Sequence, residues 1–201
     1  MNKQHIEECI KGILQEIGEN PNREGLIGTP DRIARMYTEI FRGYDEKQAP
    51  KITTFRNGVD GIAYSEAVYD TGKFYSMCEH HMMPFFGTYT FAYMPAPHGK
   101  ILGLSKIARV VDYCSAKLQL QERLCYEVVS MLERELRRGE NAENYPKGLI
   151  IQMRAKHLCK SMRGSKKEGI MMATYATGVF RDPQKRAEFE RECIIIGGWE
   201  K

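Results

Sequence analysis

The sequence lacks the features that would place the protein in a membrane or outside the cell. No apolar run approaches the roughly 20 residues needed to span a bilayer, and the mostly polar start, Asn2–Glu8, does not resemble a secretion signal. The six cysteines show no regular disulfide spacing. We therefore expect a cytoplasmic protein with reduced thiols and no membrane partner.

A strong charge of one sign is also missing. The chain has 30 lysines and arginines against 26 aspartates and glutamates, which gives a formal net charge of +4. This mild excess does not indicate a nucleic-acid partner, although it would suit a small polyanionic substrate. Solvated surface side chains account for most of these cations. With 201 residues and 42% hydrophobic content, the chain is long enough for one globular domain with a helical appendage.

Hydrophobic periodicity predicts two leading helices, followed by a larger mixed domain. Isoleucines and leucines recur at helical spacing from Ile6 to Ile17, and Gly18 ends that helix. Thr29 is expected to cap a second helix that has Pro30 in its first position. No function is assigned to the apolar tail Ile194–Trp199. The expected division is a helical lead-in at 1–44, a loop at 45–61, the main domain at 62–192 and a tail at 193–201.

Strand and helix patterns follow one another in the main domain, which indicates the α+β class. Tyr89, Phe91 and Tyr93 alternate with smaller residues, as in a strand with two unlike faces. Asp70-Thr71-Gly72 is a turn signal between two shorter strands. The expected strands are 62–69, 74–77, 86–94, 101–104, 149–153 and 171–180, and helices are expected to start at Ser105, Gln121 and Asp182.

Potential metal ligands lie together in Cys78-Glu79-His80-His81. Cys78 and His81 have the Cys-x-x-His spacing, which lets one tight turn aim both side chains at an ion, and this pair suits zinc. Alone, such a pair is more often a packing feature. His157 and Cys159 strengthen the hypothesis, because alternate residues of a strand point to the same face. Cys78, His81 and Cys159 would leave a fourth position open, as in catalytic zinc sites.

Two histidines and a basic helix start complete the candidate site. His80 and His157 would lie beside the metal without binding it, and imidazoles exchange protons near neutral pH. Ser105, Lys106 and Arg109 gather where a predicted helix offers free N–H groups to a phosphate. Capping by Ser105 with two solvated cations explains these three residues equally well.

Four segments together resemble type I GTP cyclohydrolase, a zinc-dependent family. The likeness runs in order from about residue 6 to 190, and such a set is far more specific than any single motif. The segments are Gly25–Tyr37 (GLIGTPDRIARMY), Ser76–Phe85 (SMCEHHMMPF), Gly103–Arg109 (GLSKIAR) with Gln119–Leu124 (QLQERL), and His157–Gly164 (HLCKSMRG).

The resemblance implies the tunnelling fold, in which antiparallel sheets with two helices between strand pairs join into a barrel of several subunits. Here an N-terminal helical pair precedes that fold. A homo-oligomer, a decamer with sites between subunits, is implied as well, because sheet edges need covering. The family opens the imidazole ring of GTP and releases formate. It recloses the remaining atoms as 7,8-dihydroneopterin triphosphate, for folate, other pterins or deazapurines.

The same resemblance implies roles for individual residues. Zinc on Cys78, His81 and Cys159 would activate water for attack at C8 of guanine. An acid at a helix start ordinarily complements the helix dipole, but Glu122 would here accept two parallel N–H bonds from guanine. The other implied roles are proton transfer to the guanine imidazole by His80 and to the ribose by His157, support of the guanine pocket by Gln121, and ribose and triphosphate binding by Ser105, Lys106, Arg109 and Arg163.

Departures from the family pattern lie beside this site. Arg154, Lys156 and Lys160 stand where acidic and apolar residues are common, and Met171–Thr177 has fewer hydroxyl groups. A divergent relative that stops at a ring-opened formamide, or that uses another purine nucleotide, therefore stays open. A non-catalytic, metal-stabilised binding protein is a third hypothesis, although two spare imidazoles beside the metal argue against it.

Overall fold

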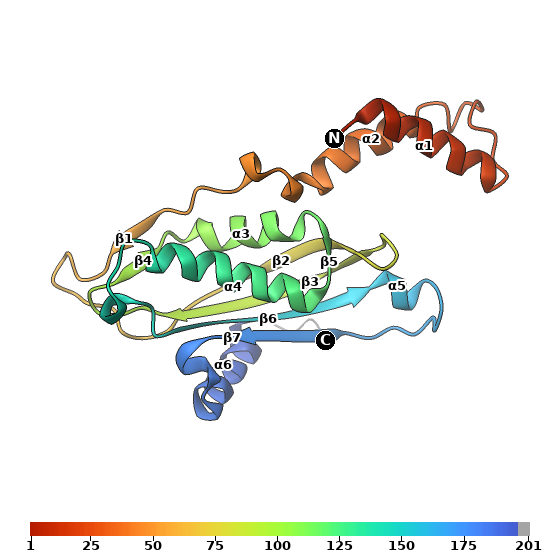
Figure 1. The fold of residues 1–201 in the computed structure, drawn as a ribbon. Helices are drawn as coiled ribbons and strands as arrows, with labels where there is room; N and C mark the ends of the chain where they lie inside the picture. The colour runs from red at the N-terminus through yellow and green to blue at the C-terminus, as the bar shows by residue number, and fades with distance from the viewer. Residues whose placement is uncertain (197–201) are drawn as a thin grey trace.

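The computed structural model describes residues 1–196, and its main body is a sheet with helices on both faces (Figure 1). The N-terminal helices α1 (Lys3–Glu16) and α2 (Thr29–Ile40) project beyond one end of this body. Gly18 follows α1 with a positive φ of 88°, which suits its expected role as the helix stop. Among the described residues, no helix combines the length and apolar character that crossing a bilayer requires.

The sheet has five strands in the order β5-β2-β3-β6-β7. Neighbouring strands run antiparallel, except that the two-residue β5 pairs in parallel with β2. Strands β1 and β4 form a separate antiparallel ribbon. The bounds are β1 Thr54–Arg56, β2 Val68–Cys78, β3 Pro84–Met94, β4 Lys100–Leu102, β5 Leu118–Gln119, β6 Gly148–His157 and β7 Met171–Ala176.

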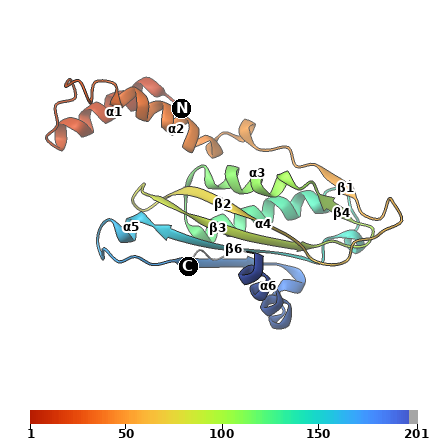
Figure 2. The ribbon, with the colours of Figure 1, turned by 180° about the vertical axis from the view of Figure 1, so that it is seen from behind.

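Helices α3 and α4 cover one face of the sheet and α6 lies on the other, as Figure 2 shows from behind. The predicted alternation in β3 is confirmed, because Tyr89, Phe91 and Tyr93 join the core under α3 and α4 while Ala92 joins the core under α6. The predicted α+β class, with two helices between strand pairs, is confirmed too. The remaining helices are α3 Ser105–Ser115, α4 Gln121–Arg137, α5 Leu158–Ser161 and α6 Pro183–Ile196, with short 3-10 helices η1 Arg42–Tyr44, η2 Glu46–Gln48, η3 Ala142–Asn144 and η4 Gly178–Arg181.

The turn predicted at Asp70-Thr71-Gly72 is wrong, because all three residues lie inside β2. Gly72 is paired with Tyr89 of β3, and a Cβ atom at position 72 would lie 2.8 Å from the Tyr89 ring. The Tyr89 hydroxyl donates a 2.8 Å hydrogen bond to the Asp70 carboxylate. The glycine therefore allows an aromatic ring to approach the strand backbone. Such close approach, and not a turn, explains the glycine inside this strand.

Several predicted boundaries also differ from the structure. Thr29 is the first residue of α2 and not its cap, since Gly28 occupies the cap position without a side-chain hydrogen bond. The segment 45–61, expected to be a loop, contains β1, whose backbone groups pair with β4. The predicted strand 171–180 ends at Ala176 and continues into η4. In the expected tail, residues 193–196 belong to α6, and 197–201 lie outside the described residues.

Candidate metal centre

The turn between β2 and β3 presents the first ligand candidates. The backbone N–H of Cys78 donates to Met83 at 2.8 Å, and the N–H of Met82 donates back to Cys78 at 2.8 Å. Met82 has a positive φ of 51°, so the chain reverses tightly within a few residues. Cys78 is buried at the end of β2, whereas His80 and His81 are exposed in the turn.

The third ligand candidate, Cys159, follows the strand on the other side of β3 and lies in α5. Phe85 is paired with His157, which places the end of β6, and α5 after it, beside the β2–β3 turn. Side-chain ligand atoms of Cys78, His81 and Cys159 all lie within 4.8 Å of one another. Zn–S bonds of about 2.3 Å and Zn–N bonds of about 2.0–2.1 Å would need separations of roughly 3.4–3.8 Å between ligand atoms. Small side-chain movements would therefore let these three residues hold zinc.

The proximity of the two thiols would suit a bound cation, because cation binding removes their protons. Burial raises the pKa of the Cys159 thiol, and the neighbouring Cys78 thiol raises it further. Two thiolates side by side repel each other, and a divalent cation between them would remove that cost.

The geometry nevertheless differs from the expected one, because His157 and Cys159 do not share a strand. His157 ends β6, and Cys159 lies in the single turn of α5.

The two further histidines lie next to these ligand candidates. His80 Nδ1 is 3.8 Å from Cys78 Sγ, and His157 Nδ1 is 4.0 Å from Cys159 Sγ. The His157 ring stacks on the buried Phe85 ring, with centroids 4.6 Å apart and planes 5° from parallel. Burial lowers the pKa of His157, which favours its neutral form.

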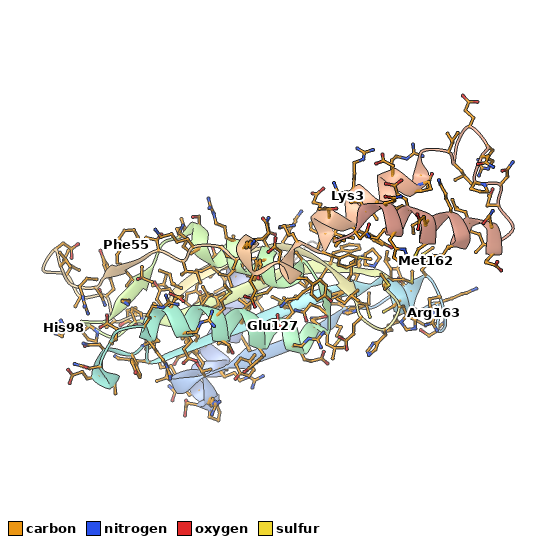
Figure 3. The ribbon with its side chains drawn as sticks, turned by 45° about the horizontal axis from the view of Figure 1, so that its top comes forward. Lys3, Phe55, His98, Glu127, Met162 and Arg163 are labelled. Atoms are coloured by element: carbon orange, nitrogen blue, oxygen red, sulfur yellow. The ribbon has the colours of Figure 1, made fainter. Side chains whose placement is uncertain are left out.

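The first turn of α4 brings Gln121 and Glu122 to the same end of the sheet. Gln121 is buried, and its Oε1 lies 2.8 Å from Nε2 of His157. Glu122 is exposed on the neighbouring position. Arg163, which follows α5, contacts the imidazole of His81, and Figure 3 shows Arg163 at the end of the molecule opposite His98.

The predicted phosphate residues are not part of this cluster within one chain. Ser105, Lys106 and Arg109 lie on the first turns of α3, which begins at the end of the sheet where β4 lies, whereas α5 lies at the other end (Figure 1). Leu104, and not Ser105, occupies the cap position of α3. One chain therefore holds the metal and purine candidates at one end and these phosphate candidates toward the other.

Sequence reasoning missed an ion pair that ties the turn with Cys78 and His81 to α4. The Arg123 guanidinium donates to the Glu79 carboxylate and, at 2.9 Å, to the side-chain oxygen of Gln119. The Glu79 backbone N–H donates to the Gln119 carbonyl at 3.1 Å. Glu79 and Arg123 are 44 positions apart, and no local pattern signals such a contact.

The sequence pattern of GTP cyclohydrolase I matches residues 6–193. The chain belongs to this family. The resemblance seen in its motifs is thereby confirmed, and with it the expected tunnelling-fold class of the subunit.

Proteins named GTP cyclohydrolase 1 align with this chain over almost their full length. The protein of Clostridium kluyveri is 43% identical over 186 residues, which covers 90% of this chain and 92% of the relative. That of Caldanaerobacter subterraneus is 43% identical, with coverages of 94% and 95%, and that of Streptococcus agalactiae is 39% identical, with 96% of each chain covered. Among solved structures, an archaeosine synthase QueF-Like in the apo form matches with a TM-score of 0.38 and 16% identity, over 56% of this chain and 93% of its own.

Proposed function

We propose that the protein is a zinc-dependent GTP cyclohydrolase, which hydrolyses the imidazole ring of GTP, releases formate and forms 7,8-dihydroneopterin triphosphate. The observation that carries this proposal is the approach of Cys78, His81 and Cys159 to within 4.8 Å, with His80 and His157 alongside. Family membership and relatives named GTP cyclohydrolase 1 support the same reaction.

Cys78, His81 and Cys159 would hold the zinc. Two thiolates and one imidazole are ligands that zinc prefers, and three protein ligands leave one position for water. Bound in this way, zinc would lower the pKa of that water toward about 7 and so supply a nucleophile at neutral pH. The basic Arg163, near His81, would add positive charge for the triphosphate.

The remaining side chains would bind the base and move protons. Glu122 would accept hydrogen bonds from the N1–H and 2-amino groups of guanine, which fixes the purine by its edge. His80 would give a proton to the imidazole nitrogen of guanine that loses its bond to C8. His157 would give a proton to the ribose ring oxygen and assist the later rearrangement. Each histidine regains its proton from water before the next turnover.

The separation of the two halves of the site within one chain supports a homo-oligomer, and we propose a decamer. The first turns of α3 with Ser105, Lys106 and Arg109 would reach the triphosphate from a neighbouring subunit. Strand β7 is an edge of the sheet, and pairing with another copy would satisfy its backbone groups. Light scattering tests this assembly, and an active, monodisperse monomer would contradict it.

One assay separates the proposed reaction from its alternatives. The zinc-loaded protein is incubated with GTP, and formate, pterin fluorescence and remaining GTP are measured. Formate with pterin fluorescence is expected. Loss of GTP without formate would indicate an enzyme that stops at the formamide. The basic residues Lys156 and Lys160, which depart from the family pattern beside the site, keep this alternative open. GTP that stays bound and unchanged would indicate a binding protein. Zinc-free Cys159→Ala protein is the negative control.

A further inference from the structure

The orientation of the Gln121 side-chain amide is fixed by two backbone carbonyl groups. Gln121 is 1% exposed and occupies the first position of α4. Its Nε2 donates hydrogen bonds to the carbonyl oxygens of Met153, at 2.8 Å, and Met171, at 3.2 Å. Because carbonyl oxygens only accept hydrogen bonds, the nitrogen end of the amide must face them. Oε1 then has to face the opposite way.

The partner of that oxygen is the side chain of His157. Gln121 Oε1 lies 2.8 Å from His157 Nε2. An amide oxygen has no proton to donate, so this hydrogen bond requires a proton on Nε2. A neutral imidazole carries only one proton, which leaves Nδ1 as the acceptor. Nδ1 is also the nitrogen that faces the candidate metal centre, 4.0 Å from Cys159 Sγ.

Phe85 keeps the imidazole ring in this position. The two rings are stacked 4.6 Å apart at an angle of 5°, and Phe85 is itself fully buried. Phe85 is held edge-on by Phe74, with centroids 6.0 Å apart. Stacking sets the plane of the imidazole ring, and the hydrogen bond to Gln121 sets its rotation within that plane.

We propose that Gln121 is a positioning residue that holds neutral His157 as the tautomer with its proton on Nε2. Each proton that His157 exchanges then enters and leaves at Nδ1. This inference rests on the proton-transfer role of His157 in the proposed function. When Nδ1 takes up a proton, Nε2 keeps its own proton and its bond to Gln121. When Nδ1 passes that proton to the substrate, the starting tautomer returns, and Gln121 neither gains nor loses a proton.

The test reads the tautomer directly in the zinc-loaded, full-length protein. Histidine labelled with nitrogen-15 is incorporated, and solid-state NMR of the sedimented protein at mildly alkaline pH distinguishes protonated from unprotonated ring nitrogens. The signals of His157 are assigned by their absence from His157→Asn protein. We expect a protonated Nε2 and an unprotonated Nδ1 in the wild type.

A matched pair of variants separates positioning from the simple loss of a buried amide. Gln121→Met keeps the side-chain length but removes the acceptor, so the preference for one tautomer should be lost and turnover should fall by about 10- to 100-fold with unchanged zinc content. Gln152→Met is the control, because Gln152 is a 6% exposed amide on β6 that bonds to Thr174 and not to histidine. It should change neither the tautomer nor turnover.

Two results would overturn the inference, namely a wild-type His157 with its proton on Nδ1, or an unchanged tautomer in Gln121→Met. The wild-type spectrum decides the assignment even if Gln121→Met does not fold. Failure of the proposed function would be distinct, because the wild type would then produce neither formate nor pterin from GTP while the spectrum still reported the tautomer.

Discussion

Replacing Glu122 by glutamine removes the proposed reader of the guanine edge while keeping the size of the side chain. Glu122 is exposed in the first turn of α4, and within residues 1–196 no hydrogen bond or ion pair is formed by its carboxylate. The substitution should therefore leave the fold intact. In the variant, an amide NH2 would face the N1–H or 2-amino group of guanine, so that donor meets donor.

The size of the effect follows from the number of hydrogen bonds at stake. Hydrogen bonds to a charged group contribute about 1.5–3 kcal/mol each, so losing two would cost roughly 3–6 kcal/mol. Since each 1.4 kcal/mol is tenfold in affinity, GTP binding should weaken by about 10²–10⁴-fold. ATP lacks the N1–H and 2-amino donors, so the wild type should bind ATP more weakly than GTP by a similar factor.

Calorimetric titration of the zinc-loaded wild type with GTP and with ATP, and of Glu122→Gln with GTP, measures both effects. Glu135→Gln is the control, because it removes one acid near the other end of the same helix. Zinc content and particle size should be the same in all three proteins. Equal affinity of the wild type for both nucleotides, or full GTP affinity in Glu122→Gln, would show that the base is recognised elsewhere.

Five other substitutions test the candidate metal site and the sheet. Cys159→Ala should lose stoichiometric zinc in elemental analysis, because two ligands do not hold the ion; full retention would refute the ligand assignment. His80→Ala should keep zinc but lower turnover by roughly 10²–10⁴-fold, whereas loss of zinc would show that His80 is the ligand in place of its neighbour. Gly72→Ala should lower the free energy of unfolding in urea by about 1–3 kcal/mol, because its Cβ would meet the Tyr89 ring at 2.8 Å. In a protein that already carries Tyr89→Leu, the same Gly72→Ala substitution should cost less. Burial raises the pKa of Asp70, so the folded state disfavours its charged form. Asp70→Asn should therefore be at least as stable as the wild type at neutral pH. Any advantage of the variant in melting temperature should shrink as the pH falls through the raised pKa, because the wild-type carboxyl then also becomes neutral.

The candidate ligands were recognisable in the sequence because they depend on side-chain chemistry and on short spacings. The Cys-x-x-His pair fixes Cys78 and His81 in one turn whatever the rest of the fold does. Hydrophobic periodicity likewise indicated the two faces of β3 and the helices that cover one of them. Both features depend only on residues that are close together in the chain, so the sequence is enough to recognise them.

The turn predicted at residues 70–72 shows where local reasoning fails. Asp, Thr and Gly are typical turn residues, yet here Gly72 makes room for the Tyr89 ring and Asp70 accepts the Tyr89 hydroxyl. Both contacts cross from β2 to β3, and pairing with a neighbouring strand outweighs the local preference for a turn. The same holds for Cys159, which lies beside the other ligand candidates in α5 and not in a strand.

The sequence by itself determined which chemical groups are available: two thiols, three imidazoles and a carboxylate suited to zinc, proton transfer and guanine. The tertiary structure decided which of their atoms face one another. The pairing of β3 with β6 stacks His157 on Phe85, and the packing of α4 brings Gln121 to His157 across 36 positions of the chain. Protonation of a particular ring nitrogen depends on such a distant hydrogen-bond partner. The identity of the partner follows from strand register and helix packing, which no short stretch of sequence contains.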